Sequence, residues 1–252
     1  MSATSYLQGI LAREAVDTSQ NSPVRGVIAI LQPHISQWAG SMLRSVSASG
    51  SFAKGTANKN GTDIDLFISI SNNCNESLGA IYASLLKKLQ GLNLNPRQQN
   101  VSLNVKVAGF DVDLVPAKHQ GNAGEDHSLY RRRANTWTQT NVAKHIAKVS
   151  GSGRTQEIRV LKLWRNQKGL DFPSFYLELT VINALSGKTG TLDQNVWTVL
   201  QYLRDNFANA RVVDPANTNN VISDDLTVAE RAKIVAATTT ALKAKDWNEI
   251  VK

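Results

Sequence analysis

Cysteine is almost absent from this chain: Cys74 is the only one among 252 residues. An internal disulfide is therefore excluded, and so is a zinc cluster built on cysteine ligands. Any metal ion must be held by oxygen or histidine ligands, and the four histidines show no metal-ligand spacing.

Long apolar runs are also missing. No run approaches the ~20 residues that a helix needs to cross a bilayer. The N-terminal stretch MSATSYLQGILAREAVD is too polar and acidic for a signal peptide. With 42% hydrophobic residues, the chain can still bury a globular core. We expect a soluble, cytoplasmic protein with no membrane partner, and the sequence leaves its oligomeric state open.

Negative charge is in deficit. The formal net charge is +8 and the pI is about 9.6. Clustered Lys and Arg attract phosphates and release counterions, so the partner is expected to be a nucleotide or a nucleic acid. The alternative is a basic protein that binds nothing through this charge.

Periodicity predicts a mixed lobe followed by a helical one. Pro116 ends the strand-rich part, and a polar loop at 118–128 follows. The predicted class is α+β and bilobal, with a sheet lobe over residues 1–120 that includes a long N-terminal helix, and a helical lobe over 121–252 that completes a cleft. The predicted helices are 24–42 with a kink or an interruption at Pro33, 78–89, 141–149, 155–168, 174–186, 192–208 and 227–250. The predicted strands are 45–49, 63–70 and a hairpin over 101–117 turning at Ala108-Gly109.

Two aspartates stand one residue apart at the start of a predicted strand. Alternation places Asp63 and Asp65 on one face, with α-carbons roughly 7 Å apart, and turns Ile64 into the core. Two carboxylates at this spacing repel each other unless a cation lies between them. Magnesium fits, because it prefers hard oxygen ligands and leaves sites open for substrate phosphates.

A third acidic ligand is expected on a neighbouring strand. In FDVDLVP, the residues Phe110, Val112 and Leu114 are expected to share the buried face, which leaves Asp111 and Asp113 on the other. Three carboxylates could hold two metal ions about 4 Å apart, one activating a hydroxyl and one neutralising a triphosphate. The alternative is that these aspartates merely solubilise a sheet face.

A Gly-Ser pair lies thirteen residues ahead of Asp63, in the stretch GSFAKGTANKNGTDID. The Gly50 backbone can approach a phosphate closely, and the Ser51 hydroxyl can donate to its oxygens. The pair alone carries little information. Its spacing to the aspartates predicts a phosphate-binding turn beside a metal site.

These motifs resemble the polymerase-β-type nucleotidyltransferase superfamily, over about residues 45–117. The resemblance implies transfer of a nucleoside monophosphate from an NTP with two Mg²⁺ or Mn²⁺ ions. It assigns the metal ions and the catalysis to Asp63, Asp65 and a third aspartate, best matched by Asp113 because the apolar pair and Pro116 follow it.

The helical half resembles the oligoadenylate synthetase and cyclic GMP-AMP synthase branch, with its bacterial cyclic-oligonucleotide synthases, in RVLKLWRNQKG, PSFYLELTVINAL and DPANTNNV. It implies that Lys162 contacts the triphosphate, Ser174 a phosphate and Phe175 a base. From position alone, Lys162 lies opposite the apolar helix face and is free to reach a cleft or solvent. Ser174 could instead cap a helix and Phe175 fill a core, while Glu178 is expected to pair internally.

The predicted function is therefore metal-dependent synthesis of a 2′- or 3′-linked, linear or cyclic oligonucleotide messenger from ATP, GTP or both, with release of pyrophosphate. Nucleotide addition to an RNA 3′ end, or to a protein, is the alternative. Arg131, Arg132 and Arg133, near Tyr130 and Trp137, could bind an acceptor or RNA, or could be a solvated edge.

Overall fold

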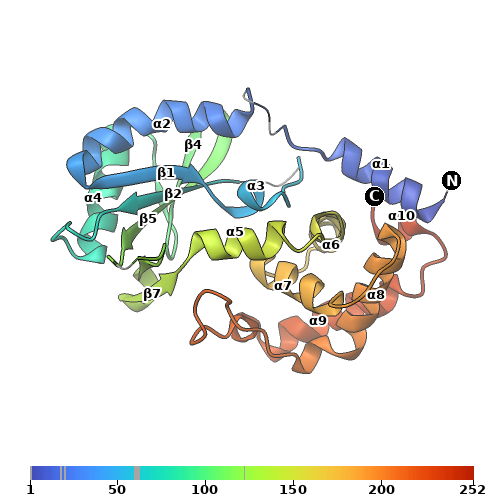
Figure 1. Cartoon of the computed structure of the whole chain (residues 1–252). Coiled ribbons are helices and arrows are strands. Elements are labelled where there is room, and N and C mark those ends of the chain that lie inside the picture. Colours follow the sequence, from blue (N-terminus) through green and yellow to red (C-terminus); the bar gives the residue numbers. More distant parts are fainter. Residues whose placement is uncertain (1, 18, 20, 60–62, 122) are drawn as a thin grey trace. The chain divides into compact units, whose positions relative to one another are not determined.

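The computed structural model describes residues 2–17, 19, 21–59, 63–121 and 123–252 (Figure 1). The chain forms two compact units. One comprises Asp17–Lys54 and Gly61–Ile146, and we call it the sheet unit. The other comprises Met1–Val16, Gly55–Asn60 and Ala147–Lys252, and we call it the helical unit. Each is described by itself.

The sheet unit contains a seven-stranded mixed sheet in the order β1-β2-β5-β4-β3, with β6 paired to β5 and β7 to β6. Strands β2 and β5 are parallel, and the other pairs are antiparallel. The strands are β1 Leu43–Ala48, β2 Ile64–Ile70, β3 Arg97–Gln98, β4 Leu103–Val107, β5 Phe110–His119, β6 His127–Arg131 and β7 Thr136–Thr140.

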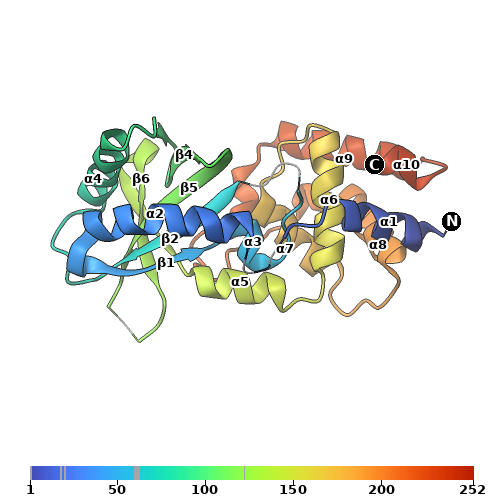
Figure 2. The ribbon, with the colours of Figure 1, turned by 90° about the horizontal axis from the view of Figure 1, so that it is seen from above.

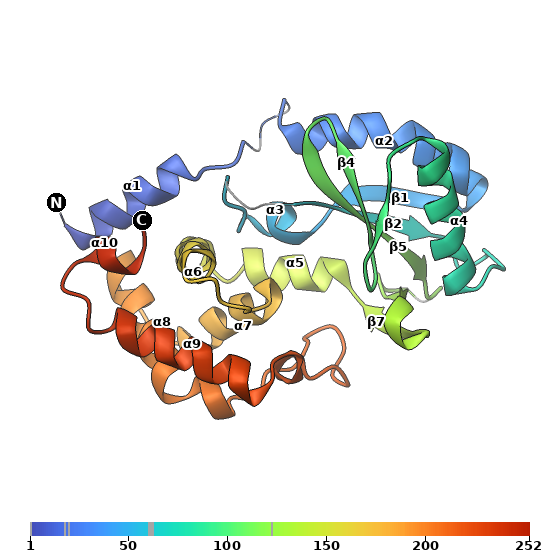
Figure 3. The ribbon, with the colours of Figure 1, turned by 180° about the vertical axis from the view of Figure 1, so that it is seen from behind.

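One face of the sheet is buried under two helices, α2 (Pro23–Ala39) and α4 (Leu78–Gly91) (Figures 1 and 3). Every second residue of the strands points into this core, including Ile64, Leu66 and Leu114. The other residues of β2 and β5 therefore point to the opposite face. There Phe67, Ala117 and Leu129 form a smaller cluster with Val142, the first residue of α5 (Val142–Ser150).

The helical unit packs around α6 (Thr155–Gln167) and α7 (Ser174–Ala184), whose Trp164 and Tyr176 are fully buried. The N-terminal helix α1 (Ala3–Arg13) lies beside α6 and α8, as Figure 2 shows. The remaining elements of this unit are α8 Leu192–Asp205, the short 3₁₀ turns Phe207–Asn209 and Ile222–Asp225, α9 Val228–Ala241 and α10 Trp247–Ile250.

The α+β class and the mixed sheet are confirmed, and several details differ. The predicted helix 227–250 is interrupted, because α9 ends at Ala241 and α10 begins at Trp247. Phe110 is 39% exposed rather than buried, since it flanks the hairpin turn. Helix α2 continues through Pro33, so the helix is not interrupted there. In the described part of the chain, no helix is long and apolar enough to cross a membrane.

Candidate active site

The Gly-Ser turn lies directly against Asp65, the second aspartate of the D-x-D motif. Gly50 has a left-handed backbone, with φ of +57°, and a Cβ placed on it would lie 1.7 Å from Oδ2 of Asp65. The amide of Ser49 donates to the Asp65 carbonyl at 2.8 Å. Only glycine fits at position 50. Ser51 follows in the short helix α3 (Gly50–Lys54), so the turn and the D-x-D strand meet as their spacing predicted.

Strand register builds a row of four polar residues across the sheet. Asp65 is paired with Asp113, Asp113 with Asn104, and Asn104 with Arg97. Paired residues on adjacent strands present their side chains on the same face. We call Asp65, Asp113, Asn104 and Arg97 the polar row. The register thus brings together two of the three predicted metal ligands.

Asp63, the other predicted ligand, is exposed just before β2 begins. Burial raises the pKa of its carboxyl above the usual value, the charges of Asp113 and Asp111 raise it further, and Arg97 lowers it. Asp63 is therefore within electrostatic reach of the two aspartates of β5. Mutual repulsion of this kind is relieved by a cation.

Asp63, Asp65 and Asp113 have the chemistry that magnesium or manganese requires, because all three supply hard oxygen donors. Within the described residues, however, no three acidic, histidine or cysteine side chains converge closely enough to enclose a metal ion unaided. The three aspartates therefore remain the predicted ligands. The side chain of Asp111 is drawn instead toward Arg97, whose Nη2 lies 3.5 Å from its Oδ1, which favours Asp113 as the third ligand.

Asp113 has partners that the sequence reasoning missed. Its Oδ1 accepts a hydrogen bond from Nδ2 of Asn104 at 2.8 Å and another from Nε2 of Gln99 at 3.1 Å. The sequence does contain a pattern that predicts the position of Asn104. A hairpin with the two-residue turn Ala108-Gly109 fixes the register of its strands, and that register sets Asn104 opposite Asp113.

Lys162 does not face solvent, which rules out one of the two alternatives that its helix position left open. It is only 5% exposed, and its Nζ donates to Oε1 of Glu178 at 2.6 Å and to Oγ1 of Thr56 at 3.0 Å. The expected internal pairing of Glu178 is confirmed. Lys162 can be buried because Glu178 on α7 supplies a buried carboxylate, whereas an ammonium without a partner would be too costly to bury. Contact between Lys162 and a triphosphate stays a prediction.

Ser174 and Phe175 open helix α7. Ser174 is the first helical residue rather than its cap, and its hydroxyl accepts a hydrogen bond from Nη1 of Arg165 at 2.9 Å. The capping alternative is therefore wrong. Phe175 is half-buried against the core of the helical unit. Neither the phosphate contact of Ser174 nor base stacking by Phe175 is decided by these positions, and both remain predictions.

The segment Gly55–Asn60, which links the Gly-Ser turn to the aspartates, belongs to the helical unit. We call its described part, residues 55–59, the connector. Arg159 of α6 holds it: Nε donates to the Ala57 carbonyl and to Oδ1 of Asn58, both at 3.1 Å. Nη2 of Arg159 also donates to the carbonyls of Leu11 and Glu14, at 2.9 and 3.0 Å. One arginine therefore joins the connector to the end of α1.

The basic run lies on the hairpin of β6 and β7. Its three arginines, 131–133, are exposed, and Trp137 is 56% exposed. The hairpin contacts the loop before β4, because Nε of Arg132 donates to the Gln99 carbonyl at 3.1 Å. Arg131 ends β6, and Arg132 and Arg133 lie in the short 3₁₀ turn Arg132–Ala134 that leads to β7. The binding role of the run stays a prediction.

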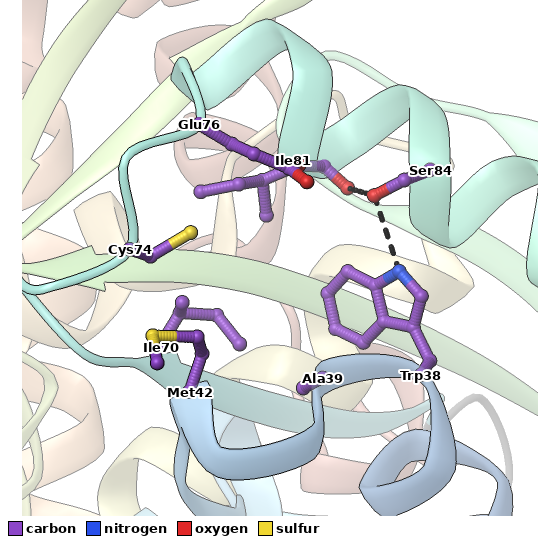
Figure 4. Close-up of a pocket in the computed structure, with 8 residues that line it drawn as sticks. All are labelled: Trp38, Ala39, Met42, Ile70, Cys74, Glu76, Ile81 and Ser84. Atoms are coloured by element: carbon purple, nitrogen blue, oxygen red, sulfur yellow. Dashed lines mark hydrogen bonds between the residues drawn. The ribbon is translucent and has the colours of Figure 1, made fainter.

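A small cavity of about 80 Å³ opens at the other end of the sheet unit (Figure 4). Its walls are mostly apolar, with Trp38, Met42 and Ile81 facing one another. The indole of Trp38 donates to Oγ of Ser84 at 3.1 Å. Ile70, the last residue of β2, lines it, whereas the aspartates lie at the start of that strand. The cavity is therefore separate from the polar row.

Comparison with known proteins identifies the type of domain that contains this site. Residues 37–134 match the family model of the nucleotidyltransferase domain. These residues form a nucleotidyltransferase domain. The matched range contains the Gly-Ser turn, the three aspartates and the whole polar row.

The chain as a whole resembles bacterial synthases of cyclic oligonucleotides. It is 24% identical over 174 residues to the cyclic AMP-AMP-AMP synthase of Escherichia coli strain MS 115-1, and the match spans 62% of this chain but only 54% of that protein. The solved structure of E. coli MS115-1 CdnC with ATP has a TM-score of 0.79 and 19% identity, and covers 99% of this chain and 97% of its own.

A second solved structure has the same fold. The CdnE cyclic dinucleotide synthase of Elizabethkingia meningoseptica, with GTP and Apcpp, has a TM-score of 0.72 and 12% identity, and covers 99% of both chains. The predicted resemblance to the cyclic-oligonucleotide synthase branch is confirmed. At these identities, the solved structures establish the fold.

Proposed function

We propose that this nucleotidyltransferase joins nucleotides into a 2′- or 3′-linked oligonucleotide, linear or cyclic. The oxygen of an acceptor hydroxyl forms a bond to the α-phosphorus of an NTP, and the bond to pyrophosphate breaks. The hydroxyl proton passes to a carboxylate of the site. The observation that carries the proposal is the placement of Asp65 and Asp113 side by side, against the Gly50 turn.

Asp63, Asp65 and Asp113 are proposed to hold two Mg²⁺ or Mn²⁺ ions. Bound metal supplies charge neutralisation on the triphosphate and acidifies the attacking hydroxyl. Gly50 lets the backbone approach the phosphates, and the Ser51 hydroxyl donates to a phosphate oxygen. The roles of Lys162, Ser174 and Phe175 in nucleotide binding rest on the family resemblance.

ATP, GTP or both are the proposed substrates. Support comes from similar proteins, since the E. coli CdnC structure contains ATP and the E. meningoseptica CdnE structure contains GTP. The excess of positive charge suits a polyanionic substrate. An RNA ligand is a further proposal, carried only by the exposed arginines at 131–133.

The test is incubation with all four NTPs and Mg²⁺, with pyrophosphate release measured and products identified by mass spectrometry. Release should be lost in Asp63→Asn and Asp113→Asn. It should persist in the control Asp205→Asn, which alters an exposed aspartate at the end of α8. Undiminished release in either active-site variant would contradict the proposal.

The products separate the alternatives. Label in small oligonucleotides supports the proposed function. Label at RNA 3′ ends, in a reaction supplied with RNA, would instead identify nucleotide addition to RNA. Label on protein would identify protein nucleotidylation.

A further inference from the structure

The orientation of the Asn104 side chain in the polar row is fixed by a guanidinium. Nε and Nη2 of Arg97 donate to Oδ1 of Asn104, at 3.2 and 2.7 Å. A guanidinium has no acceptor, so the amide oxygen of Asn104 must face Arg97. Its NH₂ group must consequently face Asp113. An amide that could otherwise flip is held in one orientation.

Asn104 and Gln99 both donate to the same oxygen of Asp113. The distances to Oδ1 are 2.8 Å from Nδ2 of Asn104 and 3.1 Å from Nε2 of Gln99. Gln99 is oriented in turn by Ser102, whose hydroxyl donates to its Oε1 at 2.7 Å. Among the described residues, Oδ2 of Asp113 accepts no hydrogen bond. The two oxygens of one carboxylate are thus made inequivalent.

Burial makes this arrangement rigid. Asn104 is only 3% exposed, although it is an asparagine in the middle of a sheet. A buried amide is costly unless its hydrogen bonds are made, and here the hydrogen-bond partners are charged groups on both sides. Leucine has the same branched outline and needs no hydrogen bond. The polar choice at this position therefore suits a purpose beyond packing.

We infer that Asn104 is a positioning residue for Asp113, and the inference rests on the proposed function of that aspartate as a metal ligand. Asn104 occupies Oδ1 and leaves Oδ2 to the cation. Arg97 acts one step further out, because it sets which end of the Asn104 amide faces the carboxylate. Hydrogen-bonded partners of this kind orient carboxylate ligands and tune their affinity for a metal.

The test measures Mn²⁺ binding to the nucleotide-free protein by titration calorimetry. Asn104→Leu keeps the branched outline and removes the donor, and should raise the dissociation constant for Mn²⁺ about 10–100-fold. Gln98→Leu is the matched control, because it removes an exposed amide from the neighbouring strand β3. Its affinity should equal that of the unaltered protein.

A structural role alone would lower the melting temperature of Asn104→Leu and leave its Mn²⁺ affinity unchanged in the folded protein, which would overturn the inference. Should Asn104→Leu fail to fold, Gln99→Leu serves instead, because Gln99 is exposed. It removes one of the two donors and should weaken Mn²⁺ binding by a smaller factor. Unchanged binding in Gln99→Leu would then count against the inference.

The role of Asn104 and the proposed function can be refuted independently of each other. Metal binding is measured without turnover, so a protein whose Mn²⁺ affinity depends on Asn104, yet which releases no pyrophosphate, would refute only the proposed reaction. A protein that releases pyrophosphate, but whose Asn104→Leu variant retains both Mn²⁺ affinity and rate, would refute only the role of Asn104.

Discussion

The ammonium of Lys162 and the carboxylate of Glu178 form an ion pair of 2.6 Å inside the helical unit, at 5% and 0% exposure. The Thr56 hydroxyl donates to the same Oε1 at 2.8 Å. Removing two charges from water is costly, and only a close pair with additional hydrogen bonds offsets that cost. The pair therefore holds the connector to the core of the helical unit.

Removing one member of this pair should destabilise the protein strongly. Glu178→Ala leaves the ammonium of Lys162 buried without its carboxylate and should lower the free energy of unfolding by about 3–5 kcal/mol. Denaturant titration measures the change. The control Glu249→Ala alters an exposed glutamate of α10 and should stay within about 0.5 kcal/mol. A loss of similar size in both variants would contradict the prediction.

A methyl group at Gly50 should abolish catalysis by displacing Asp65. Gly50→Ala would place Cβ 1.7 Å from Oδ2 of Asp65, and such a displacement should slow pyrophosphate release about 100-fold or more. Gly40 is the matched control, since its φ is +54° and a Cβ there meets nothing within 4 Å. Gly40→Ala should cost only about 1–2 kcal/mol of backbone strain. Equal rates in the two variants would disprove the clash.

His127 should make the sheet unit sensitive to acid. Burial lowers the pKa of its imidazole below the ordinary value of 6.5, and the charges of His119 and Arg44 lower it further, whereas Glu125 raises it through its carbonyl and its charge. The Ser69 hydroxyl lies 2.7 Å from Nε2, and the Glu125 carbonyl lies 2.9 Å from Nδ1. Neutral imidazole satisfies both, donating from Nδ1 and accepting at Nε2.

Proton binding by the unfolded chain determines how the free energy of unfolding changes with pH. Below pH 6.5 the unfolded chain protonates this histidine before the folded protein does, so the free energy of unfolding falls as the pH drops. One such group gives a slope of at most about 1.4 kcal/mol per pH unit. His127→Asn should flatten the slope measured by urea titration. Leu129→Ala, on the same strand, should lower stability without changing the slope.

Arg159 should control the mobility of the connector. Arg159→Lys keeps the positive charge but cannot reproduce the forked hydrogen bonds to Ala57 and Asn58. Hydrogen exchange of the amides at 56–59 should become faster. The control Arg165→Lys alters another arginine of α6, one that contacts the Phe172 carbonyl and Ser174, and exchange at 56–59 should remain slow. Unchanged exchange in Arg159→Lys would show that other contacts suffice.

Much of the sheet unit was predictable because alternation in β2 and β5 is regular. The buried positions Ile64, Leu66 and Leu114 imply where Asp65 and Asp113 point. Strands β6 and β7 were missed, because segments such as TWTQT have no apolar alternation. Strand β6 forms by pairing with β5, and β7 by pairing with β6, and neither pairing is visible in the local sequence pattern.

The interior of the helical unit was less predictable. Helical periodicity describes one helix at a time, and within its own helix Lys162 lies on the polar face. Its burial depends on Glu178, on the next helix, and on Thr56, more than a hundred residues earlier. Asn104 was missed for a different reason. Its register was available from the hairpin, but sequence reasoning about metal sites looks for ligands rather than for the side chains that orient them.

The division of the chain also bears on how the protein is made. Neither unit is one continuous stretch of polypeptide, because the helical unit draws on residues before Val16, on the connector and on residues after Ala147. During synthesis α1 leaves the ribosome long before its neighbours α6 and α8 exist. A gene cut at residue 120 would separate α1 from those neighbours. Expression of either half alone should therefore yield an incomplete core rather than an independent domain.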